Sequence, residues 1–254
     1  MSEADHPPQY KLTIAYDGTI YSGWQRQREP IPTVQGVVEK ALSEILNCNI
    51  GISGASRTDA GVHAWGQVAV LRADIQIPLD RFRMAVNSRL PHDVLIRRIE
   101  PVADQFDVTR AQRKRYRYVI WQSKDRPLFN RQYMYHYWQD VSMEAMRDGC
   151  RYFVGRHDFA AFRGGEDERQ TTVRNIFHCD MHRRGPIIIM SVEGDGFLYH
   201  MVRNMVGTLL EIGRGRMAPD VIARAIESGR RSDVGPCAPA SSLCLMWVRY
   251  ADTK

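Results

Sequence analysis

The sequence predicts an α+β fold made of two similar α/β halves joined through a central, mostly antiparallel sheet. Each half opens with an alternating strand, Tyr10–Tyr16 and Lys114–Gln122, and continues with apolar residues at helical spacing and further strands. The stretch from Pro101 to Gln112 that connects the halves is short, so we expect them to pack closely or share one sheet. We place the halves at residues 9–108 and 109–251, without a convincing sequence repeat between them.

In the first half, the alternation of Tyr10–Tyr16 ends at Asp17-Gly18, which indicates a strand followed by a turn. Thr33 then precedes apolar residues that recur every three or four positions through Leu46, the pattern of an amphipathic helix with an N-cap. The remaining expected elements are strands at Ile50–Ala55, Gly66–Leu71 and Val94–Ile99 and a helix marked by Phe82, Val86 and Leu90.

The second half repeats this order after its opening strand. Ser142 is a suitable N-cap for a helix whose apolar positions are Met146, Cys150, Phe153 and Val154 and which ends by Gly155. The remaining expected elements are an antiparallel pair at Val173–His182 and Pro186–Val192, an apolar helix at Leu198–Ile212, a short helix opened by Pro219, and a final strand at Leu243–Tyr250.

Composition limits the class of protein. Lys and Arg number 35 against 29 Asp and Glu, a formal net charge of +6 that suits a polyanionic partner without proving one. The 5 cysteines include no C-x-x-C pair, which argues against a disulfide framework and a thiolate metal site and is typical of a reducing cytosol. Met1 to Gln9 lacks the apolar core of a signal peptide, and no stretch approaches the roughly 20 apolar residues of a membrane span. We therefore expect a soluble cytoplasmic protein that does not contact membranes.

The most informative segment is residues 54–64, G-A-S-R-T-D-A-G-V-H-A, between two expected strands. An ordinary surface turn accounts for it, because Asp and Gly are favoured in turns and Gly61 can supply a positive φ. The alternative is a rigid loop that presents Arg57 and Asp59 to one cleft, the cation to a phosphate or base and the carboxylate for covalent chemistry. Residue types alone leave both interpretations open.

This segment resembles the active-site motif of the TruA family of tRNA pseudouridine synthases, in which an R-T-D-A-G-V-H core carries a nucleophilic Asp. The family's motifs recur in order over most of the chain. They are Y-D-G at 16–18, G-W-Q-R-Q at 23–27, V-Q at 34–35, N-x-x-L-P at 87–91, R-Y-R-Y at 115–118, D-F…F-R at 158–163 and H-M-V-R-N at 200–204. Two residues depart from the family pattern, because Ser56 and Ser242 stand where Gly is usual.

The resemblance implies the pseudouridine synthase fold, with a catalytic cleft between the halves and Asp59 as its nucleophile. It implies that Arg203 is the cation that pairs with Asp59, since an ionised carboxylate shielded from water needs a nearby positive charge. From the residues alone, the alternative is a guanidinium that extends to solvent or caps a carbonyl of the chain.

The resemblance assigns substrate contacts to four more residues. Tyr116 is the ring expected to stack on the uracil, and Arg57 the group that fills the place of the flipped base or clamps a phosphate. Leu243 and Leu245 are expected to form an apolar wall. The competing explanations are a tyrosine packed in the core, a solvated turn arginine and two ordinary core leucines.

The family acts on uridines 38, 39 and 40 of the tRNA anticodon arm as a homodimer, and these are the expected substrate and assembly. Isomerising uridine to pseudouridine inherently requires neither a metal nor a redox cofactor, so we expect none. Which tRNAs are used, and whether Asp59 attacks the base, attacks C1′ or drives a glycal route, are left open. Phosphate contacts are expected from clustered arginines, each of which is otherwise an ordinary solvated group: Arg26 with Arg28, Arg110 to Arg117, Arg163, and Arg214 with Arg216.

Three other functions compete with this interpretation. A serine hydrolase built on Ser53, His63 and Asp59 lacks the G-x-S-x-G spacing around the serine. A zinc site at His178, Cys179 and His182 has no second ligand pair at metal spacing. The serious alternative is an inert tRNA-binding or chaperone protein of the same fold, which loss of the Asp would signal, and Asp59 is present.

Overall fold

The computed structural model describes residues 7–165 and 171–251, so residues 1–6 of the polar N-terminal segment lie outside the described residues. The chain divides into two compact units, each described by itself. The first unit runs to Ala111 and also contains Leu245–Tyr250, and the second runs from Gln112 to Cys244. The expected halves, 9–108 and 109–251, differ from these units mainly in the placement of Leu245–Tyr250.

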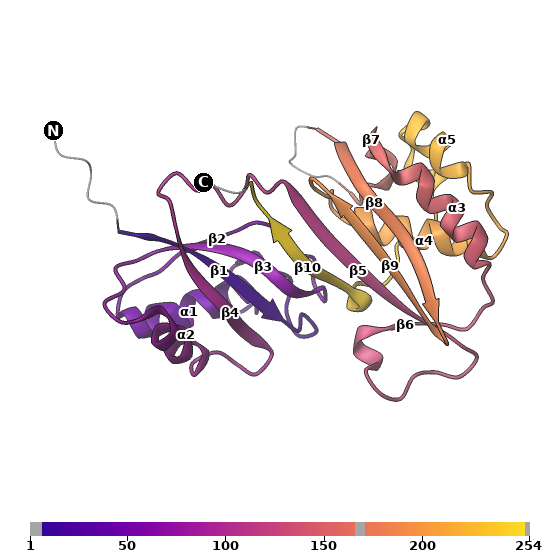
Figure 1. Cartoon of the computed structure of the whole chain (residues 1–254). Coiled ribbons are helices and arrows are strands. Elements are labelled where there is room, and N and C mark those ends of the chain that lie inside the picture. The colour runs from indigo at the N-terminus through magenta and orange to yellow at the C-terminus, as the bar shows by residue number, and fades with distance from the viewer. Residues whose placement is uncertain (1–6, 166–170, 252–254) are drawn as a thin grey trace. The chain divides into compact units, whose positions relative to one another are not determined.

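The first unit is a largely antiparallel sheet with two helices packed against it (Figure 1). Its strand order is β4-β1-β3-β10, and β2 pairs with β3 off this path. Tyr10 lies opposite Leu71 of β3 and Pro101 of β4. The elements are β1 (Gln9–Tyr16), α1 (Val34–Leu46), β2 (Ile52–Gly54), β3 (His63–Arg72), α2 (Leu79–Asn87), β4 (Val94–Val102) and β10 (Leu243–Arg249), whose residues from Leu245 on belong to this unit.

The second unit repeats this plan with a second sheet segment of order β5-β9-β8-β7, against which three helices pack (Figure 1). The short strand β6 adds to β5 in parallel. The elements are β5 (Arg113–Gln122), β6 (Tyr135–Tyr137), α3 (Met143–Phe153), β7 (Gly155–Asp158), β8 (Val173–Arg184), β9 (Ile187–Gly194), α4 (Met201–Gly213) and α5 (Val221–Ser228). Short 3-10 helices occur at Arg131–Tyr133, Ala160–Phe162, Arg231–Asp233 and Ala240–Ser242.

The expected fold class is confirmed, and so are the two helix caps. The Thr33 hydroxyl accepts from Gly36 N, and the Ser142 hydroxyl accepts from Ala145 N. Several boundaries differ from the expected ones. Helix α4 begins at Met201 rather than Leu198, because His200 has a left-handed backbone (φ 58°) that a helix cannot continue through. Helix α2 ends at Asn87, so Leu90 lies beyond it, and the short strands β6 and β7 were not predicted.

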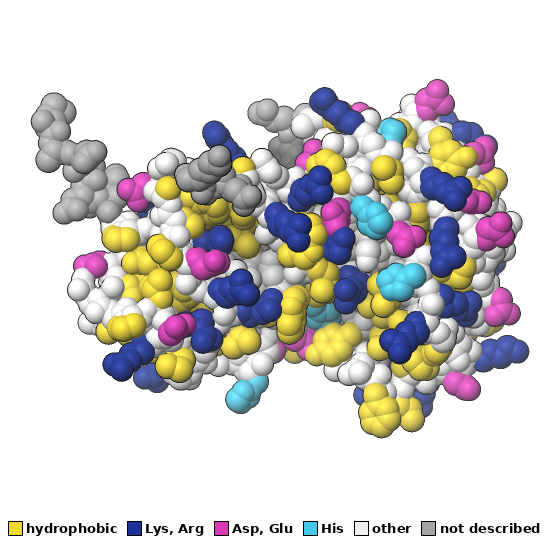
Figure 2. Space-filling view, in the orientation of Figure 1, with side chains coloured by type: hydrophobic (Ala, Val, Ile, Leu, Met, Phe, Trp, Pro, Cys, Tyr) yellow, Lys and Arg dark blue, Asp and Glu magenta, His cyan; other side chains and the backbone are white. Residues whose placement is uncertain are grey.

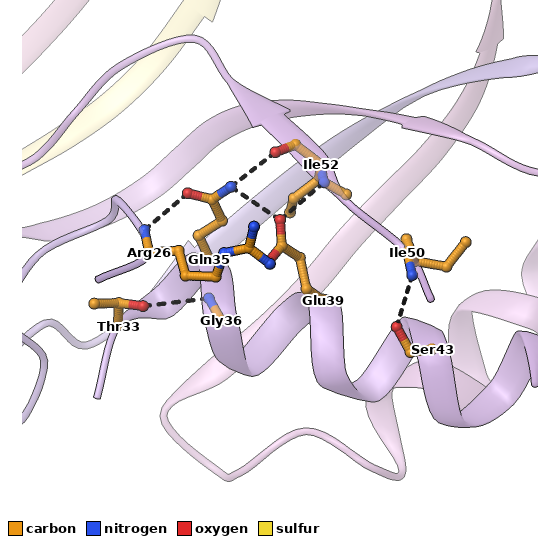
Figure 3. A network of polar contacts seen from close by, with 8 residues as sticks. All are labelled: Arg26, Thr33, Gln35, Gly36, Glu39, Ser43, Ile50 and Ile52. Carbon is orange, nitrogen blue, oxygen red and sulfur yellow. Dashed lines mark hydrogen bonds and ion pairs between the residues drawn. The ribbon is translucent and has the colours of Figure 1, made fainter. Parts of the chain in front are cut away.

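A buried polar network joins α1 to β2, the strand that leads into the segment of Asp59 (Figure 3). Glu39, which is 5% exposed, accepts from Ile52 N at 3.0 Å and from the Gln35 side-chain amide at 2.9 Å. The same amide donates to Ile52 O at 2.9 Å, so both backbone polar groups of Ile52 bond to α1. Arg26 completes the network with an ion pair to Glu39 at 3.0 Å. The strand is thereby fixed by side chains on one edge and by β3 on the other.

We expect Glu39→Ala to lower the free energy of unfolding by about 2–4 kcal/mol, because it leaves Ile52 N–H buried without an acceptor and removes one of the two acceptors of the Gln35 amide. Glu44→Ala is the matched control, since Glu44 is an exposed residue of the same helix, and its effect should stay within about 0.5 kcal/mol. Urea denaturation of both variants measures the difference. Equal stabilities of the two variants would contradict the importance of this network.

Candidate active site

The segment between β2 and β3 is a tight loop whose two ends are fixed by the sheet. Ala55 N donates to Val68 O at 2.8 Å, and the fully buried Gln67 donates its side-chain amide to Ser56 O at 2.6 Å. Val62 N donates to Asp59 O at 3.1 Å and closes a turn in which Gly61 has a φ of +76°. The expected positive φ at Gly61 is therefore confirmed.

A second segment, between β1 and α1, holds the middle of this loop at Thr58. The hydroxyls of Thr58 and Tyr16 lie 2.7 Å apart in a buried hydrogen bond, and Trp24 N donates to Thr58 O at 3.1 Å. Gly23 makes this approach possible, since a Cβ there would lie 2.6 Å from Thr58 O and its φ is +94°. Side chain and backbone of Thr58 are both fixed, so the backbone of the next residue, Asp59, is also positioned.

The end of the loop is tied to the turn after β1 through His63. Its Nδ1 lies 3.0 Å from Gly18 N and 3.1 Å from an Asp17 carboxylate oxygen. An unprotonated Nδ1 accepts from Gly18, whereas a protonated Nδ1 pairs with Asp17, so the imidazole bridges the two segments in either state. Sequence reasoning did not assign this role to His63, although the motifs at 16–18 and 57–63 contain all three residues.

Tyr21 adds a further hydrogen bond between the segment 16–24 and the loop. Its carbonyl accepts from Gly61 N at 3.2 Å, and its hydroxyl donates to an Asp93 carboxylate oxygen at 2.7 Å. Burial and the neighbouring Asp93 raise the pKa of Tyr21, so the phenol remains a hydrogen-bond donor throughout the physiological pH range. Five residues of the segment 16–24, namely Tyr16, Asp17, Gly18, Tyr21 and Trp24, therefore contact the loop and its exit into β3.

Within the first unit, the loop carries Arg57 and Asp59 at different depths. Arg57 is exposed, Thr58 is 7% exposed, and Asp59 is half-buried. A carboxylate at this depth is accessible to a ligand while its backbone is held rigidly. An ordinary flexible surface turn therefore does not describe the segment.

In the second unit, Arg203 lies in the first turn of α4. Its Nε donates to Ala238 O at 2.7 Å, and Ala238 N donates to Arg203 O at 3.2 Å. The guanidinium thus caps a carbonyl, which is one of the two alternatives that the sequence leaves open for Arg203. This bond fixes the direction of the Nε–H group, and the remaining N–H groups of the guanidinium point in other directions. The pairing of Arg203 with Asp59 joins residues of different units and stays a prediction.

Tyr116 is a buried residue of β5, 6% exposed, opposite Val192 of β9. Its ring meets Phe197 edge-on, with centroids 5.1 Å apart. Leu243 and Leu245 begin β10 and are 5% and 0% exposed. The burial of these side chains fits an apolar wall and a core equally, and their substrate contacts stay predictions.

The segment before β10 contains Ser242, one of the departures from the family pattern. Ser242 is 2% exposed and ends a short 3-10 helix. The nearby Tyr118 hydroxyl donates to Pro239 O at 2.9 Å, and burial raises the pKa of Tyr118, which keeps it a donor. The Ser242 side chain is therefore buried inside the second unit.

The described residues contain no group of three or more His, Cys, Asp or Glu side chains that could hold a metal ion. Residues 178 and 179 differ in environment as alternation requires, since His178 is exposed and Cys179 is buried. Nor does any helix among residues 7–165 and 171–251 have the length and hydrophobicity to span a bilayer.

Comparisons with known proteins identify the class. A family model described as tRNA pseudouridine synthase matches residues 12–109 and 150–251. The chain is 43% identical to tRNA pseudouridine synthase A 2 of Clostridium perfringens over 94% of its length and 98% of that protein's. It is 42% identical to tRNA pseudouridine synthase A of Acetivibrio thermocellus, with the same coverage of both chains. A crystal structure of a Cbf5-Nop10-Gar1 complex aligns with 88% of this chain and 60% of that chain at 12% identity and a TM-score of 0.40.

The chain therefore belongs to the tRNA pseudouridine synthase family, and the resemblance drawn from its motifs is confirmed. Its relatives are isomerases that act on tRNA, and we assign it the same enzyme class. The family model matches the loop of Asp59 and the helix of Arg203, whereas Tyr116 lies between the two matched ranges.

We expect Tyr16→Phe to lower turnover on tRNA by roughly 10-fold, because the loop of Asp59 loses a positioning contact. The free energy of unfolding should fall by only about 1–2 kcal/mol, the effect of one buried hydrogen bond. Tyr10→Phe is the control, since Tyr10 lies on the same strand and is remote from Thr58 in register. Steady-state kinetics under conditions where both variants are folded measures the effect, and wild-type turnover by Tyr16→Phe would contradict it.

Proposed function

We propose that this enzyme converts uridine to pseudouridine in the anticodon arm of tRNA, with Asp59 as the nucleophile. The observation that carries the proposal is the rigid fixation of the Thr58 backbone and hydroxyl, which positions the adjacent carboxylate. Reactive groups held in a fixed geometry need less reorganisation on the way to the transition state. A half-buried carboxylate on such a loop is suited to covalent catalysis.

The reaction breaks the N1–C1′ bond of uridine, rotates the uracil, and forms a C5–C1′ bond. The proton on C5 is released to solvent and N1 gains one, so the reaction is balanced without an oxidant or reductant. A carboxylate serves this chemistry either by forming a covalent adduct or by stabilising the cation at C1′ and removing the C2′ proton to give a glycal, to which that proton returns when the C5–C1′ bond forms. Both routes need the target nucleoside out of its base stack, which costs a few kcal/mol that contacts to the RNA must offset.

The remaining predicted residues take supporting roles in this proposal. Arg203 supplies positive charge from the start of α4, with its direction fixed by the bond to Ala238 O. Tyr116 provides an aromatic face for the base, Leu243 and Leu245 line the site, and Arg57 contacts a phosphate or fills the space of the flipped base. Arg203→Ala and Tyr116→Ala should each reduce turnover, and wild-type turnover would remove the residue concerned from the site.

The proposed target positions are uridines 38, 39 and 40, which the motif resemblance implies. An excess of cationic side chains supports binding of a polyanion, and Figure 2 shows Lys and Arg side chains distributed over the visible face of each unit. Two arginines of the predicted clusters are largely exposed, Arg110 (86%) and Arg26 (61%), and are therefore accessible to phosphates.

Asp59→Ala should abolish release of tritium from tRNA labelled at uridine C5, because no other group replaces the carboxylate. Asp59→Asn is the matched variant, since it keeps the size of the side chain and removes only its charge and nucleophilicity. Both variants should still bind tRNA. Undiminished release by either variant would contradict the role of Asp59, and tight binding without release by the wild type would favour the inert tRNA-binding alternative.

We also propose a homodimer, for which the support is an exposed apolar segment of the second unit. Leu128 and Phe129 are 70% and 85% exposed, an unusual position for two adjacent large apolar residues. Sedimentation equilibrium should give twice the mass of the chain at micromolar concentration, and a combined Leu128→Ser and Phe129→Ser variant should shift toward the monomer. A monomeric wild type would contradict the proposal.

A further inference from the structure

A cavity of about 400 Å³ lies in the second unit beside the C-terminal half of α4. Its lining comes from β6 and the residues after it, from α4 and the residues Arg214 and Arg216 that follow it, and from the segment 236–238. Pockets of about 300–1,000 Å³ are the usual size for small ligands. The Arg203–Asp59 chemistry proposed above uses none of the lining side chains.

Aromatic groups form one wall of this cavity. The rings of Tyr135 and Tyr137 meet edge to face with centroids 5.7 Å apart, and Trp138 is 63% exposed at the rim. A large exposed indole beside a cavity is a ready stacking platform, because every nucleobase presents a π-face. The wall is therefore suited to a flat, apolar-faced ligand.

Tyr137 places a buried hydroxyl at this cavity. The residue is 8% exposed, and its buried hydroxyl donates to no acceptor among the described residues, while the Arg214 guanidinium faces the phenol oxygen as a donor. Burial raises the pKa of Tyr137, while Arg214 nearby opposes the shift only in part, so the phenol remains a donor. A buried donor that lacks an acceptor costs about 1–3 kcal/mol, which a ligand carbonyl or ring nitrogen would recover.

Charged groups form another part of the lining, beside Tyr137. Glu211 pairs with Arg214 at 3.0 Å and with Arg216 at 3.5 Å. The Arg214 and Glu211 side chains are each 15% exposed, whereas Arg216 is 61% exposed. A carboxylate accepts from exocyclic amino and ring N–H groups of bases, and an exposed guanidinium binds phosphate. Arg214, Arg216 and Glu211 together carry a net charge of +1, so an anionic ligand is favoured.

We propose that this cavity binds one unstacked nucleotide of the tRNA substrate, with its base against Trp138 and the Tyr137 hydroxyl and its phosphate at Arg216. The proposal rests on the assigned activity toward tRNA and adds a second point of RNA recognition to it. Arg214 and Arg216 form one of the arginine clusters predicted to contact phosphate, and the cavity adds a base-binding surface beside them. Binding of an unpaired nucleotide here would favour RNAs that present one at the right distance from the target uridine.

The test is the equilibrium dissociation constant of full-length tRNA, measured by filter binding at several salt concentrations with the intact enzyme. Trp138→Ala should raise Kd roughly 5-fold or more through lost stacking. Arg216→Gln should raise Kd and reduce the slope of log K against log salt by about one, as expected for one phosphate contact. Tyr137→Phe removes only the hydroxyl, and should raise Kd for tRNA while leaving the stability of the free enzyme unchanged or higher.

Arg224→Gln is the matched control for Arg216→Gln. Both side chains are 61% exposed and paired with a carboxylate, but Arg224 of α5 pairs with Asp220, the N-cap residue of that helix, and does not line the cavity. The control should bind tRNA as the wild type does. The proposal is overturned if Trp138→Ala and Arg216→Gln bind tRNA with the affinity of Arg224→Gln.

A competition experiment separates an RNA nucleotide from a free mononucleotide. Uridine and guanosine 5′-monophosphates should compete for the cavity only at millimolar concentration, because they lack the rest of the RNA. Submicromolar mononucleotide binding that is lost in Trp138→Ala, with tRNA affinity unchanged in that variant, would overturn the proposal. If Asp59→Ala retained turnover and the cavity variants bound tRNA more weakly than the wild type, only the proposed role of Asp59 would fail. The cavity proposal would stand.

Discussion

Thr58 is the residue on which the geometry of the catalytic loop depends. Its hydroxyl is bonded to Tyr16 and its carbonyl to Trp24 N, so side chain and backbone are held by one neighbouring segment. That segment approaches closely only because residue 23 is glycine. A loop joining two strands of a sheet would ordinarily be among the more mobile parts of a protein. Here it is enclosed between β3 and the residues that follow β1.

The second unit reaches a comparable rigidity by a different means, a helix whose polar residues are buried with partners. Asn204, which is 0% exposed, donates to Phe162 O at 2.7 Å and accepts from Arg231 at 3.2 Å. The buried Thr208 hydroxyl donates to Asn204 O and accepts from Gly235 N. Because buried polar groups are costly unless satisfied, these bonds specify how α4 packs. The direction of Arg203 follows from that packing.

The fold class, most helices and strands, and the family were predictable from the sequence. Alternation in residues 10–16 and helical spacing after Thr33 and Ser142 are patterns of residues close together in the sequence. The structure forms the strand and the two helices that these patterns predict. The short strands β6 and β7 have only three and four residues, too few to show a period, and they are defined by pairing with the longer strands β5 and β8. The left-handed backbone of His200 likewise shortened α4 without any glycine to mark it.

At the candidate site, motif resemblance identified Asp59, Arg57 and Arg203 as residues to examine, but not how they are held. The bond between Tyr16 and Thr58 joins residues 42 positions apart, and the buried network of Glu39 joins α1 to β2. Contacts between distant residues depend on register, which composition does not encode. The Tyr137 cavity escaped sequence reasoning for the same reason, since it combines residues 135–139 with residues of α4 and the segment 236–238.

The segment that holds Thr58 also contains an exposed excursion, residues 25–32, between Trp24 and Thr33. Its base is closed by Ser22 N, which donates to Pro32 O at 2.9 Å, while Arg26 N bonds to Gln35. The tip is closed by a turn in which Ile31 N donates to Arg28 O at 3.2 Å. The excursion therefore extends the two arginines predicted to contact phosphate, Arg26 and Arg28, outward from a hydrogen-bonded base, which limits how far their backbone can move.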